Sequence, residues 1–344
     1  MLIILLGAIG DVVRALPLLG RIRRAWPETH IAWAVEPKSA PILEHHPWLD
    51  QIILYDRNRA PWAFPPFLGQ VRAGHFDLVL DLQRHLKSGI TSLVSGAPER
   101  YGFAAANTKE FNRRFSNHRV EPQPPMRLKL EQYQAFGDVL GLARIPIEFG
   151  LAPTIEETAR ARELLKDAPR PLLGVILGSS WPSRIYHPEL MARAIEQLAT
   201  PFNGDAPLFP LLLGSPDETR TADDVVRHLN GRTALNLAGR TGLRDLIPIF
   251  AQCAAAFGPD SGPMHIAAAV GCPIVSLWGS TAPERSAPWG FSEFALTADI
   301  PCHPCYLRRC PIGGECMWRI DPGDVASAVR RARAATDVAH EAPR

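Results

Sequence analysis

The feature that most constrains the fold is the alternation of strand-length apolar runs with helix-like segments along the whole chain of 344 residues. In the first half, the expected strands are 2–6, 30–35, 51–54 and 78–82, with a helix around 13–25. In the second half they are 172–176, 208–213, 234–237, 255–258 and 273–277, separated by helices such as 189–198 and 243–251. Such alternation is typical of parallel α/β units. We therefore predict doubly wound parallel sheets.

A linker would separate two such sheets, and residues 143–154 fit because they hold Pro146, Gly150 and Pro153. We predict an N-terminal domain over 1–148, a C-terminal domain over 149–325, and a C-terminal helix with a tail over 326–344. Doubly wound domains that face each other place the C-terminal ends of their strands at a shared cleft, where ligands bind.

Residues 104–128 do not follow the alternation. The segment is polar, contains Pro122, Pro124 and Pro125, and is longer than an ordinary connection. Two interpretations stay open, a mobile substrate loop and a disordered excursion.

The net charge of the chain is +2, from 37 Lys and Arg against 35 Asp and Glu. This near-neutrality argues against a dedicated nucleic-acid-binding protein, which needs a basic excess. Between Arg84 and Glu131, however, nine Lys and Arg stand against four Glu, a local charge of +5. This basic segment indicates either an anionic partner or a solvated basic loop.

No targeting segment is expected from the sequence. The apolar start MLIILLGAIG has no basic residue before it and reaches Asp11 where a signal peptide would have its cleavage site. The longest charge-free run, 261–283, contains Gly and Pro residues that a membrane-spanning helix would not carry together. We expect a soluble, cytoplasmic protein.

The first candidate site lies between the first strand and the first helix, in Gly7-Ala8-Ile9-Gly10-Asp11. The glycines permit a tight turn, and Asp11 then lies at a helix N-terminus, which stabilises its anionic form. Asp11 is either an N-cap or a general base, because an ionised carboxylate can take a proton from an attacking hydroxyl. The spacing differs from that of the dinucleotide-binding fingerprint.

A second candidate site is the run from Phe257 to His265, again a strand, a tight turn and a helix start. Ser261 suits the N-cap position, with Pro263 just inside the helix. The amides of Ser261 and Gly262 could then bind an anion, with Asp260 and His265 nearby. A capped core helix is the alternative to this phosphate-binding interpretation.

Two further loops follow strands of the second half. Ser179, Ser180 and Arg184 supply hydroxyls and a cation, as a diphosphate requires. Glu218 follows the next strand and either binds ribose hydroxyls or begins a helix. The sequence contains no D-x-D pair, no P-loop and no G-x-S-x-G motif, so helix N-termini and side chains must support any diphosphate chemistry.

Four cysteines lie close together near the C-terminus, at Cys302, Cys305, Cys310 and Cys316. In a cytoplasmic chain such a cluster seldom forms disulfides. It indicates either a structural zinc, iron or iron–sulfur site, or free thiols packed in the fold.

The segments GAIGDVVRALPLL, DLQRHLKSG and GPDSGPMHIAAAVGCPIVSLWGSTAPERSAPWG together resemble glycosyltransferase family 9, the bacterial lipopolysaccharide heptosyltransferases. The resemblance runs from Met1 to about Arg330, and the cysteine segment resembles that of the second-heptosyltransferase type. It implies a GT-B fold, in which two Rossmann-like domains face a central cleft and bind the acceptor and the sugar nucleotide respectively. It also implies inverting, metal-independent transfer of L-glycero-D-manno-heptose from an ADP-activated donor to Kdo or heptose of the inner core.

The resemblance also assigns roles to individual residues. Asp11 matches the family's proposed base, and Glu218 its ribose-binding acid. The donor phosphate contacts match Ser261, Gly262 and His265, with Ser179 and Ser180 as further hydroxyl donors. Gln83 and Lys87 match the acceptor-side pattern, in which Arg84 and His85 replace the residues around the usual Gly. Arg184 stands near the place of the family's diphosphate-binding Lys, although the spacing to the following Pro is one residue longer.

The basic segment lies in the half that the resemblance assigns to the acceptor. A carboxylate- and phosphate-bearing lipid sugar at the cytoplasmic face of the inner membrane would need such a charge. Two alternatives stay open: a family 9 relative that transfers another sugar or modifies a protein acceptor, and a non-catalytic protein that binds a nucleotide sugar.

Overall fold

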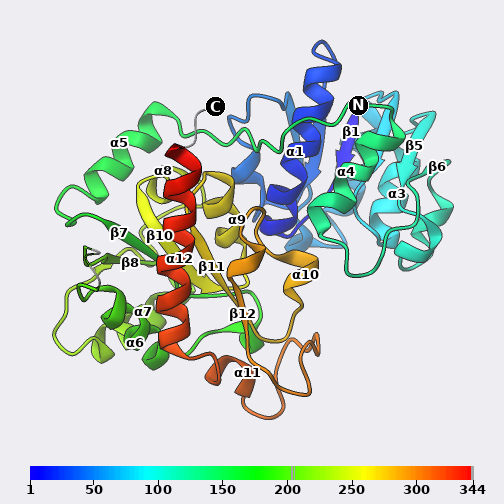
Figure 1. Ribbon diagram of the computed structural model, residues 1–344. Helices are drawn as coiled ribbons and strands as arrows, with labels where there is room; N and C mark the ends of the chain where they lie inside the picture. The colour runs from blue at the N-terminus through cyan, green and yellow to red at the C-terminus, as the bar shows by residue number, and fades with distance from the viewer. Residues whose placement is uncertain (203, 205, 342–344) are drawn as a thin grey trace. The chain divides into compact units, whose positions relative to one another are not determined.

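The computed structural model describes residues 1–202, 204 and 206–341. The chain divides into two compact units, Met1–Leu151 and Ala152–Arg344. Figure 1 shows a sheet with its own helices in each unit, the first coloured blue to green and the second green to red.

The first unit is a parallel sheet of six strands in the order β3-β2-β1-β4-β5-β6. Its strands and α-helices are, in chain order, β1 (Leu2–Ile4), α1 (Ile9–Ala25), β2 (Ala32–Val35), β3 (Gln51–Leu54), α2 (Phe64–Ala73), β4 (Leu78–Asp81), α3 (Leu86–Val94), β5 (Glu99–Gly102), β6 (His118–Arg119) and α4 (Lys129–Val139). The four strands predicted for this half are confirmed, β3 with the predicted bounds and the other three with shorter ends, and the predicted helix begins earlier, at Ile9.

The segment 104–128 is partly regular, so its interpretation as a disordered excursion is wrong, and the interpretation as a mobile substrate loop stays a prediction. It contains short 3-10 helices at Ala105–Asn107 and Asn112–Arg114. Its strand β6 pairs in parallel with β5 and forms the edge of the sheet. The short polar strand carries no apolar run, so periodicity gave no sign of it.

The second unit is also a parallel sheet of six strands, in the order β12-β11-β10-β7-β8-β9. Its elements are α5 (Ile155–Leu164), β7 (Leu172–Ile176), α6 (Pro188–Leu198), β8 (Phe209–Leu213), α7 (Thr219–His228), β9 (Leu235–Asn236), α8 (Leu246–Phe250), β10 (Cys253–Pro259), α9 (Gly262–Ala269), β11 (Ile274–Trp278), α10 (Pro283–Ser286), β12 (Ala295–Thr297), α11 (Glu315–Trp318) and α12 (Pro322–Glu341). The five strands predicted here are confirmed, and β12 is an additional edge strand.

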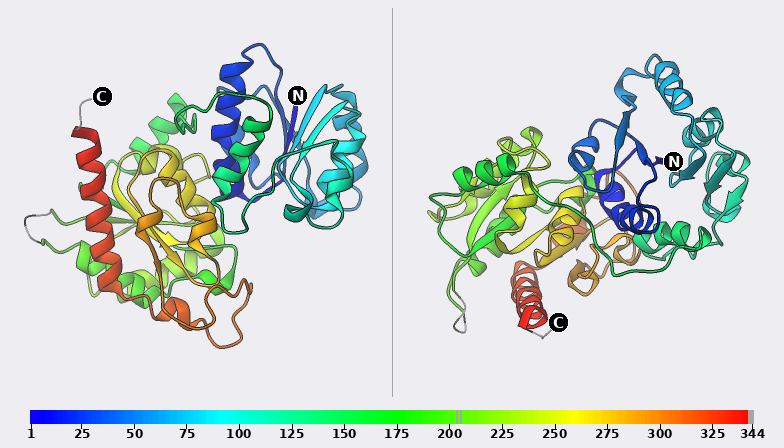
Figure 2. Two further views of the ribbon diagram at one scale, coloured as in Figure 1. Left: turned by 45° about the vertical axis from the view of Figure 1, so that its right-hand side comes forward. Right: turned by 90° about the horizontal axis from the view of Figure 1, so that it is seen from above.

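The central strands form because their residues are apolar on both faces and helices cover both faces. Every residue of β1, β7 and β11 is buried, as expected for parallel sheets enclosed between helices. In the second unit α12 packs against α6, β10 and β11, and Figure 2 shows it running along the sheet. In the described part of the chain, no helix is long and apolar enough to cross a membrane.

Both sheets reverse their strand order at one point, between β1 and β4 in the first unit and between β7 and β10 in the second. Connections leave in opposite directions there, and a crevice opens beyond the C-terminal ends of the two strands. The loops and helix starts that follow β1, β4, β7 and β10 carry most of the residues predicted to be functional, whereas Glu218 follows β8 and the four cysteines follow β12. The confirmed topology therefore brings these residues together within each unit.

Candidate functional site

Asp11 lies on the first turn of α1, directly beyond the end of β1. It is the third residue of the helix, and the N-cap is Ala8, so the interpretation of Asp11 as an N-cap is wrong. Its Oδ1 accepts a hydrogen bond from Nη2 of Arg14 at 2.6 Å. The ammonium of Lys129 lies 2.7 Å from Oδ1 and 3.1 Å from Oδ2. Two cations thus contact one carboxylate.

These cations keep Asp11 ionised. Burial alone would raise the pKa of Asp11, but the charges and hydrogen bonds of Lys129 and Arg14 outweigh it and hold the pKa well below its usual range. The pKa of the Tyr133 phenol is raised by burial and by the nearby Asp11 charge. Tyr133 therefore stays protonated beside an anionic carboxylate.

Lys129 reaches Asp11 because α4 packs along α1. Near the other end of the contact, Arg21 of α1 is almost completely buried. Its guanidinium donates to the backbone oxygens of Gln134, Leu142 and Ala143 and pairs with Asp138 at 2.9 Å. A buried guanidinium with this many partners fixes the register of the two helices, since breaking it would leave an unpaired charge inside the unit.

The loop after β4 meets the loop after β1 at the same point of the sheet. Oε1 of Gln83 accepts the amide hydrogen of Leu6 at 2.7 Å. The buried carboxylate of Asp81, at the end of β4, accepts hydrogen bonds from the Gln83 amide at 3.0 Å, from Ser88 at 3.0 Å and from Asn112 at 2.7 Å. Burial raises the pKa of Asp81 to about 7.

The three predicted acceptor-binding residues differ in their surroundings. Gln83 uses its side-chain oxygen to join the two loops. Arg84 lies over the ring of Phe103 and donates to Gln132. Lys87 has its ammonium 4.5 Å from the centre of the Tyr55 ring, and burial lowers its pKa. The structure places all three after β4.

In the second unit, the loops after β7 and β10 are joined at Asp260. The Ser179 hydroxyl donates to the backbone oxygen of Asp260 at 2.6 Å. The Arg184 guanidinium pairs with the Asp260 carboxylate at 3.0 Å, and the Thr281 hydroxyl donates to it at 2.8 Å. Arg184 also lies over the Trp181 ring, 4.0 Å from its centre. A cation and hydroxyls therefore converge at one strand switch point.

Helix α9 begins beside this cluster. Ser261 is its N-cap residue, but the side chain makes no capping hydrogen bond, and its buried hydroxyl has no hydrogen-bond partner. Gly262 is the first helical residue, and His265 is buried on the first turn. The first turn holds no acidic residue. Its backbone amides and the helix dipole favour an anion at this end.

Glu218 lies beyond the end of β8, and Ser180 lies beyond the end of β7. The Glu218 carboxylate accepts the Ser215 amide hydrogen as part of a capping box. A methyl group on Gly178 would overlap with the Glu218 side chain, so glycine at the end of β7 leaves room for this acid. Ser180 is exposed in the loop after β7. The helix-start interpretation of Glu218 is confirmed, and ribose binding stays a prediction.

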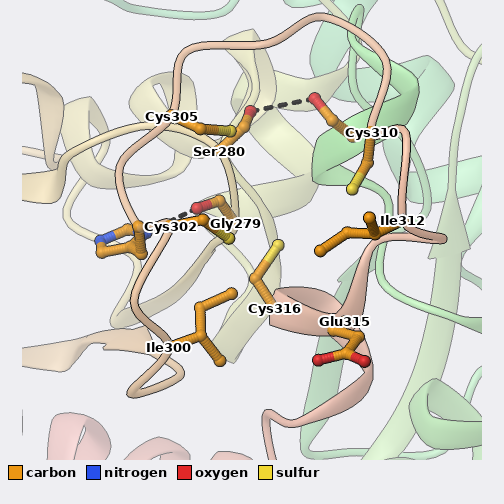
Figure 3. Close-up of a pocket in the computed structure, with 11 residues that line it drawn as sticks. Gly279, Ser280, Ile300, Cys302, Cys305, Cys310, Ile312, Glu315 and Cys316 are labelled. Atoms are coloured by element: carbon orange, nitrogen blue, oxygen red, sulfur yellow. Dashed lines mark hydrogen bonds between the residues drawn. The ribbon is translucent and has the colours of Figure 1, made fainter.

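The four clustered cysteines line one pocket, together with Gly279, Ser280 and Ile312 (Figure 3). They are Cys302, Cys305, Cys310 and Cys316, and all are free thiols. Among the described residues, no group of three or more His, Cys, Asp or Glu side chains has the arrangement of a metal site. Burial raises the pKa of Cys316, so that thiol stays protonated.

These geometries can be compared with known proteins. The family model described as Glycosyltransferase family 9 (heptosyltransferase) matches residues 67–315. The chain belongs to this family. Lipopolysaccharide core heptosyltransferase OpsX of Haemophilus influenzae is 26% identical over 291 residues, covering 83% of this chain and 81% of that protein. Lipopolysaccharide heptosyltransferase 1 of Pseudomonas aeruginosa is 27% identical over 336 residues, covering 90% and 86%.

The family 9 assignment agrees with the fold. The structure of Escherichia coli ADP-heptose lps heptosyltransferase II matches with a TM-score of 0.75 and 20% identity, over 98% of this chain and 99% of that one. The predicted GT-B fold class is confirmed on this basis. The chain is a glycosyltransferase, as its sequence predicted.

Three residues of this family 9 protein were not singled out as site residues by sequence reasoning. Lys129 was counted only as part of the basic segment, and Tyr133 and Thr281 were not considered. Lys129 is 118 positions away from Asp11, and no local motif connects the two. The basic excess of residues 84–131 was the available signal, but it could not indicate which of nine cations meets the carboxylate.

Proposed function

We propose that this glycosyltransferase moves heptose from ADP-L-glycero-D-manno-heptose to the Kdo or heptose inner core of lipopolysaccharide, with inversion and with Asp11 as general base. The family description and the names of the relatives support the sugar and the acceptor class. The observation that carries the proposal is the ionised carboxylate of Asp11 beyond β1, at the strand switch point of the first unit.

In the proposed reaction, Asp11 takes the proton of the acceptor hydroxyl while that oxygen forms a bond to the anomeric carbon. The bond from this carbon to the diphosphate oxygen breaks, and ADP leaves with the electron pair. One in-line displacement of this kind inverts the configuration. A weak base is sufficient, because the hydroxyl becomes more acidic as the new bond forms.

The C-terminal domain, proposed as 149–325, binds the sugar nucleotide in this scheme. Charge that grows on the leaving diphosphate is stabilised by the start of α9, through Ser261, Gly262 and His265, and by Arg184. Asp260 pairs with Arg184 and thereby positions it, and the Thr281 hydroxyl donates to the same Asp260 carboxylate. Ser179 and Ser180 supply further hydroxyls, and Glu218 binds the ribose.

The N-terminal domain, proposed as 1–148, binds the acceptor through Gln83, Arg84 and Lys87. The basic segment 84–131 supports an anionic acceptor, because inner-core sugars carry carboxylates and phosphates. A cytoplasmic enzyme in peripheral contact with the inner membrane would meet such an acceptor, and this location is part of the proposal.

A structural zinc or iron on the four cysteines is a separate proposal. It rests on the pocket that Cys302, Cys305, Cys310 and Cys316 share. Their present arrangement is not that of a metal site, so we assign no step of the reaction to a metal. Metal analysis of protein purified without oxygen tests this: about one equivalent supports a site, and less than about 0.1 equivalent rejects it.

The reaction is tested by incubating the protein with ADP-heptose and lipopolysaccharide truncated at the Kdo or at the first heptose. A mass gain of one heptose on the acceptor, with equimolar ADP release, supports the proposal, and NMR of the new anomeric proton reports inversion. Parallel reactions with other ADP-sugars and with protein acceptors test the alternative substrates. ADP binding without transfer in any reaction would indicate a non-catalytic binding protein.

A further inference from the structure

Both oxygens of the proposed base are occupied by the protein's own cations. Lys129 contacts both Oδ1 and Oδ2, and Arg14 contacts Oδ1. The charged and titratable groups that face Asp11 are Arg14 on α1, and Lys129 and Tyr133 on α4.

This arrangement limits the base that it stabilises. A carboxylate neutralised by two cations is a poor proton acceptor, because basicity falls as the anion is stabilised. An incoming hydroxyl must also share these carboxylate oxygens with the N–H donors that already contact them. Moving an ammonium away from Asp11 separates two opposite charges in a partly buried place, which costs free energy unless another anion replaces the carboxylate.

The two cations differ in their freedom to move. Arg14 is on the same helix as Asp11, three positions on, and its side chain is only 8% exposed. Lys129 is the first residue of α4, and its side chain is 22% exposed. Its flexible stem can swing the ammonium toward another anion while α4 stays fixed by Arg21. Lys129 is therefore the cation that a bound ligand can take over.

We propose that Lys129 restrains Asp11 in the free enzyme, and that an oxyanion of the acceptor sugar takes over the Lys129 ammonium and so releases Asp11 to accept the hydroxyl proton. This inference rests on the proposed function. Lys129 keeps its protons throughout, and it acts as a positioning residue. The proton passes from the acceptor hydroxyl to Asp11, as the glycosidic bond forms and ADP departs.

The oxyanion is a carboxylate or a phosphate of the acceptor, and two modified acceptors distinguish these sources. One carries the carboxyl group as a methyl ester, and the other lacks its phosphate. With wild-type protein, the acceptor that lacks the critical anion should show a kcat lower by about 10–100-fold, the value of a charge-assisted contact. A lower kcat for this acceptor, rather than a change in KM alone, indicates that its missing anion is needed to release Asp11.

The Lys129→Met variant should abolish this discrimination, because Asp11 is no longer restrained by a mobile cation. Its kcat should agree within about twofold between the anionic and neutralised acceptors. Lys129→Gln is the second variant, used if Lys129→Met does not fold, and Lys129→Arg should keep the discrimination. ADP affinity and circular dichroism verify that each variant is intact. Lys166→Met, at an exposed lysine paired with Glu163, controls for loss of one positive charge.

The outcomes separate the two proposals. Absence of transfer by wild-type protein to any acceptor would reject the proposed function and this inference with it. Transfer with the same discrimination in Lys129→Met as in wild type would reject only the role of Lys129, because the anion would then be recognised elsewhere. Equal kcat for all acceptors with wild-type protein would reject it as well.

Discussion

The two units share one strand order, and in both a helix begins just after a strand at the switch point, yet the two helix starts are charged differently. The first turn of α1 contains Asp11, so the chain itself supplies the anion at this N-terminus. The first turn of α9 contains no acidic residue and has the buried Ser261 hydroxyl at its cap. One start holds an internal anion, and the other is suited to the anion of a ligand.

The cations near the two helix starts also have different anionic partners. In the first unit, Lys129 and Arg14 are directed at the helix-borne carboxylate. In the second, Arg184 pairs with Asp260, which precedes α9, and the Thr281 hydroxyl holds the same carboxylate. The proposed function assigns two tasks to this shared topology, proton transfer in the first unit and diphosphate binding in the second. The two helix starts follow different strands of the shared order, β1 in the first unit and β10 in the second, and they differ in the charge of their side chains.

The largest effect on kcat is expected when Asp11, the anion supplied by the chain itself, is replaced. Asp11→Asn keeps the shape of the side chain but removes the charge, so kcat should fall by about 10²–10⁴-fold, the range of a general base. ADP affinity should stay at the wild-type value, because the proposed donor site is in the second unit. Initial rates of ADP release and calorimetric titration with ADP measure the two effects. An Asp11→Asn enzyme with unchanged kcat would show that Asp11 is not the base.

The second largest effect is expected for Arg184, the cation proposed to bind the donor diphosphate. Arg184→Met removes a guanidinium that is proposed to meet the diphosphate, and affinity for ADP should fall by about 10–100-fold. Arg184→Lys restores the charge without the planar donor fork and should recover part of this loss. Calorimetric titration compares the three proteins. Equal ADP affinity in all three would mean that Arg184 serves only to neutralise Asp260.

Much of this comparison could be anticipated from the sequence, because each helix start follows an apolar strand in a short local motif. Asp11 and Ser261 were placed correctly after β1 and β10 for that reason. The partners that give these residues their chemistry come from distant positions, as Lys129 does for Asp11. Short edge strands such as β6 were missed because two polar residues, His118 and Arg119, carry no periodicity.

A third test concerns how closely the strands approach at the second switch point. A methyl group at Gly258 would lie 2.6 Å from the backbone oxygen of Ile176. Gly258→Ala should therefore lower the free energy of unfolding by about 1–3 kcal/mol. Gly69 of α2 has no atom within 4 Å of such a methyl group, and Gly69→Ala should stabilise the helix by about 0.5–1 kcal/mol. Equal stability of Gly258→Ala and wild type in urea denaturation would contradict the close approach.

The last test contrasts Asp81 with Asp11 and Asp260, the two acids that pair with cations. Asp81 lies at the end of β4 with neutral donors only, and burial raises its pKa from 3.8 to about 7. Above about pH 4 the unfolded chain loses this proton while the folded chain retains it, so rising pH lowers the stability by up to about 1.4 kcal/mol per unit until the folded group ionises. Asp81→Asn should remove this slope.

The difference in unfolding free energy between wild type and Asp81→Asn should therefore shrink between about pH 5 and about pH 7. Asp50 provides the control. Burial would raise the pKa of Asp50, but the Ile31 amide and Arg23 outweigh it and lower the pKa. The contribution of Asp50 to stability is therefore lost only in acid. Over this range, the unfolding free energy of Asp50→Asn should follow that of wild type in parallel. If Asp81→Asn also ran parallel, Asp81 would be ionised throughout. Its three hydrogen-bond donors would then stabilise the Asp81 anion, as Arg184 stabilises the Asp260 anion. The electrostatic difference between the two units would then be limited to the pairing of Lys129 with Asp11.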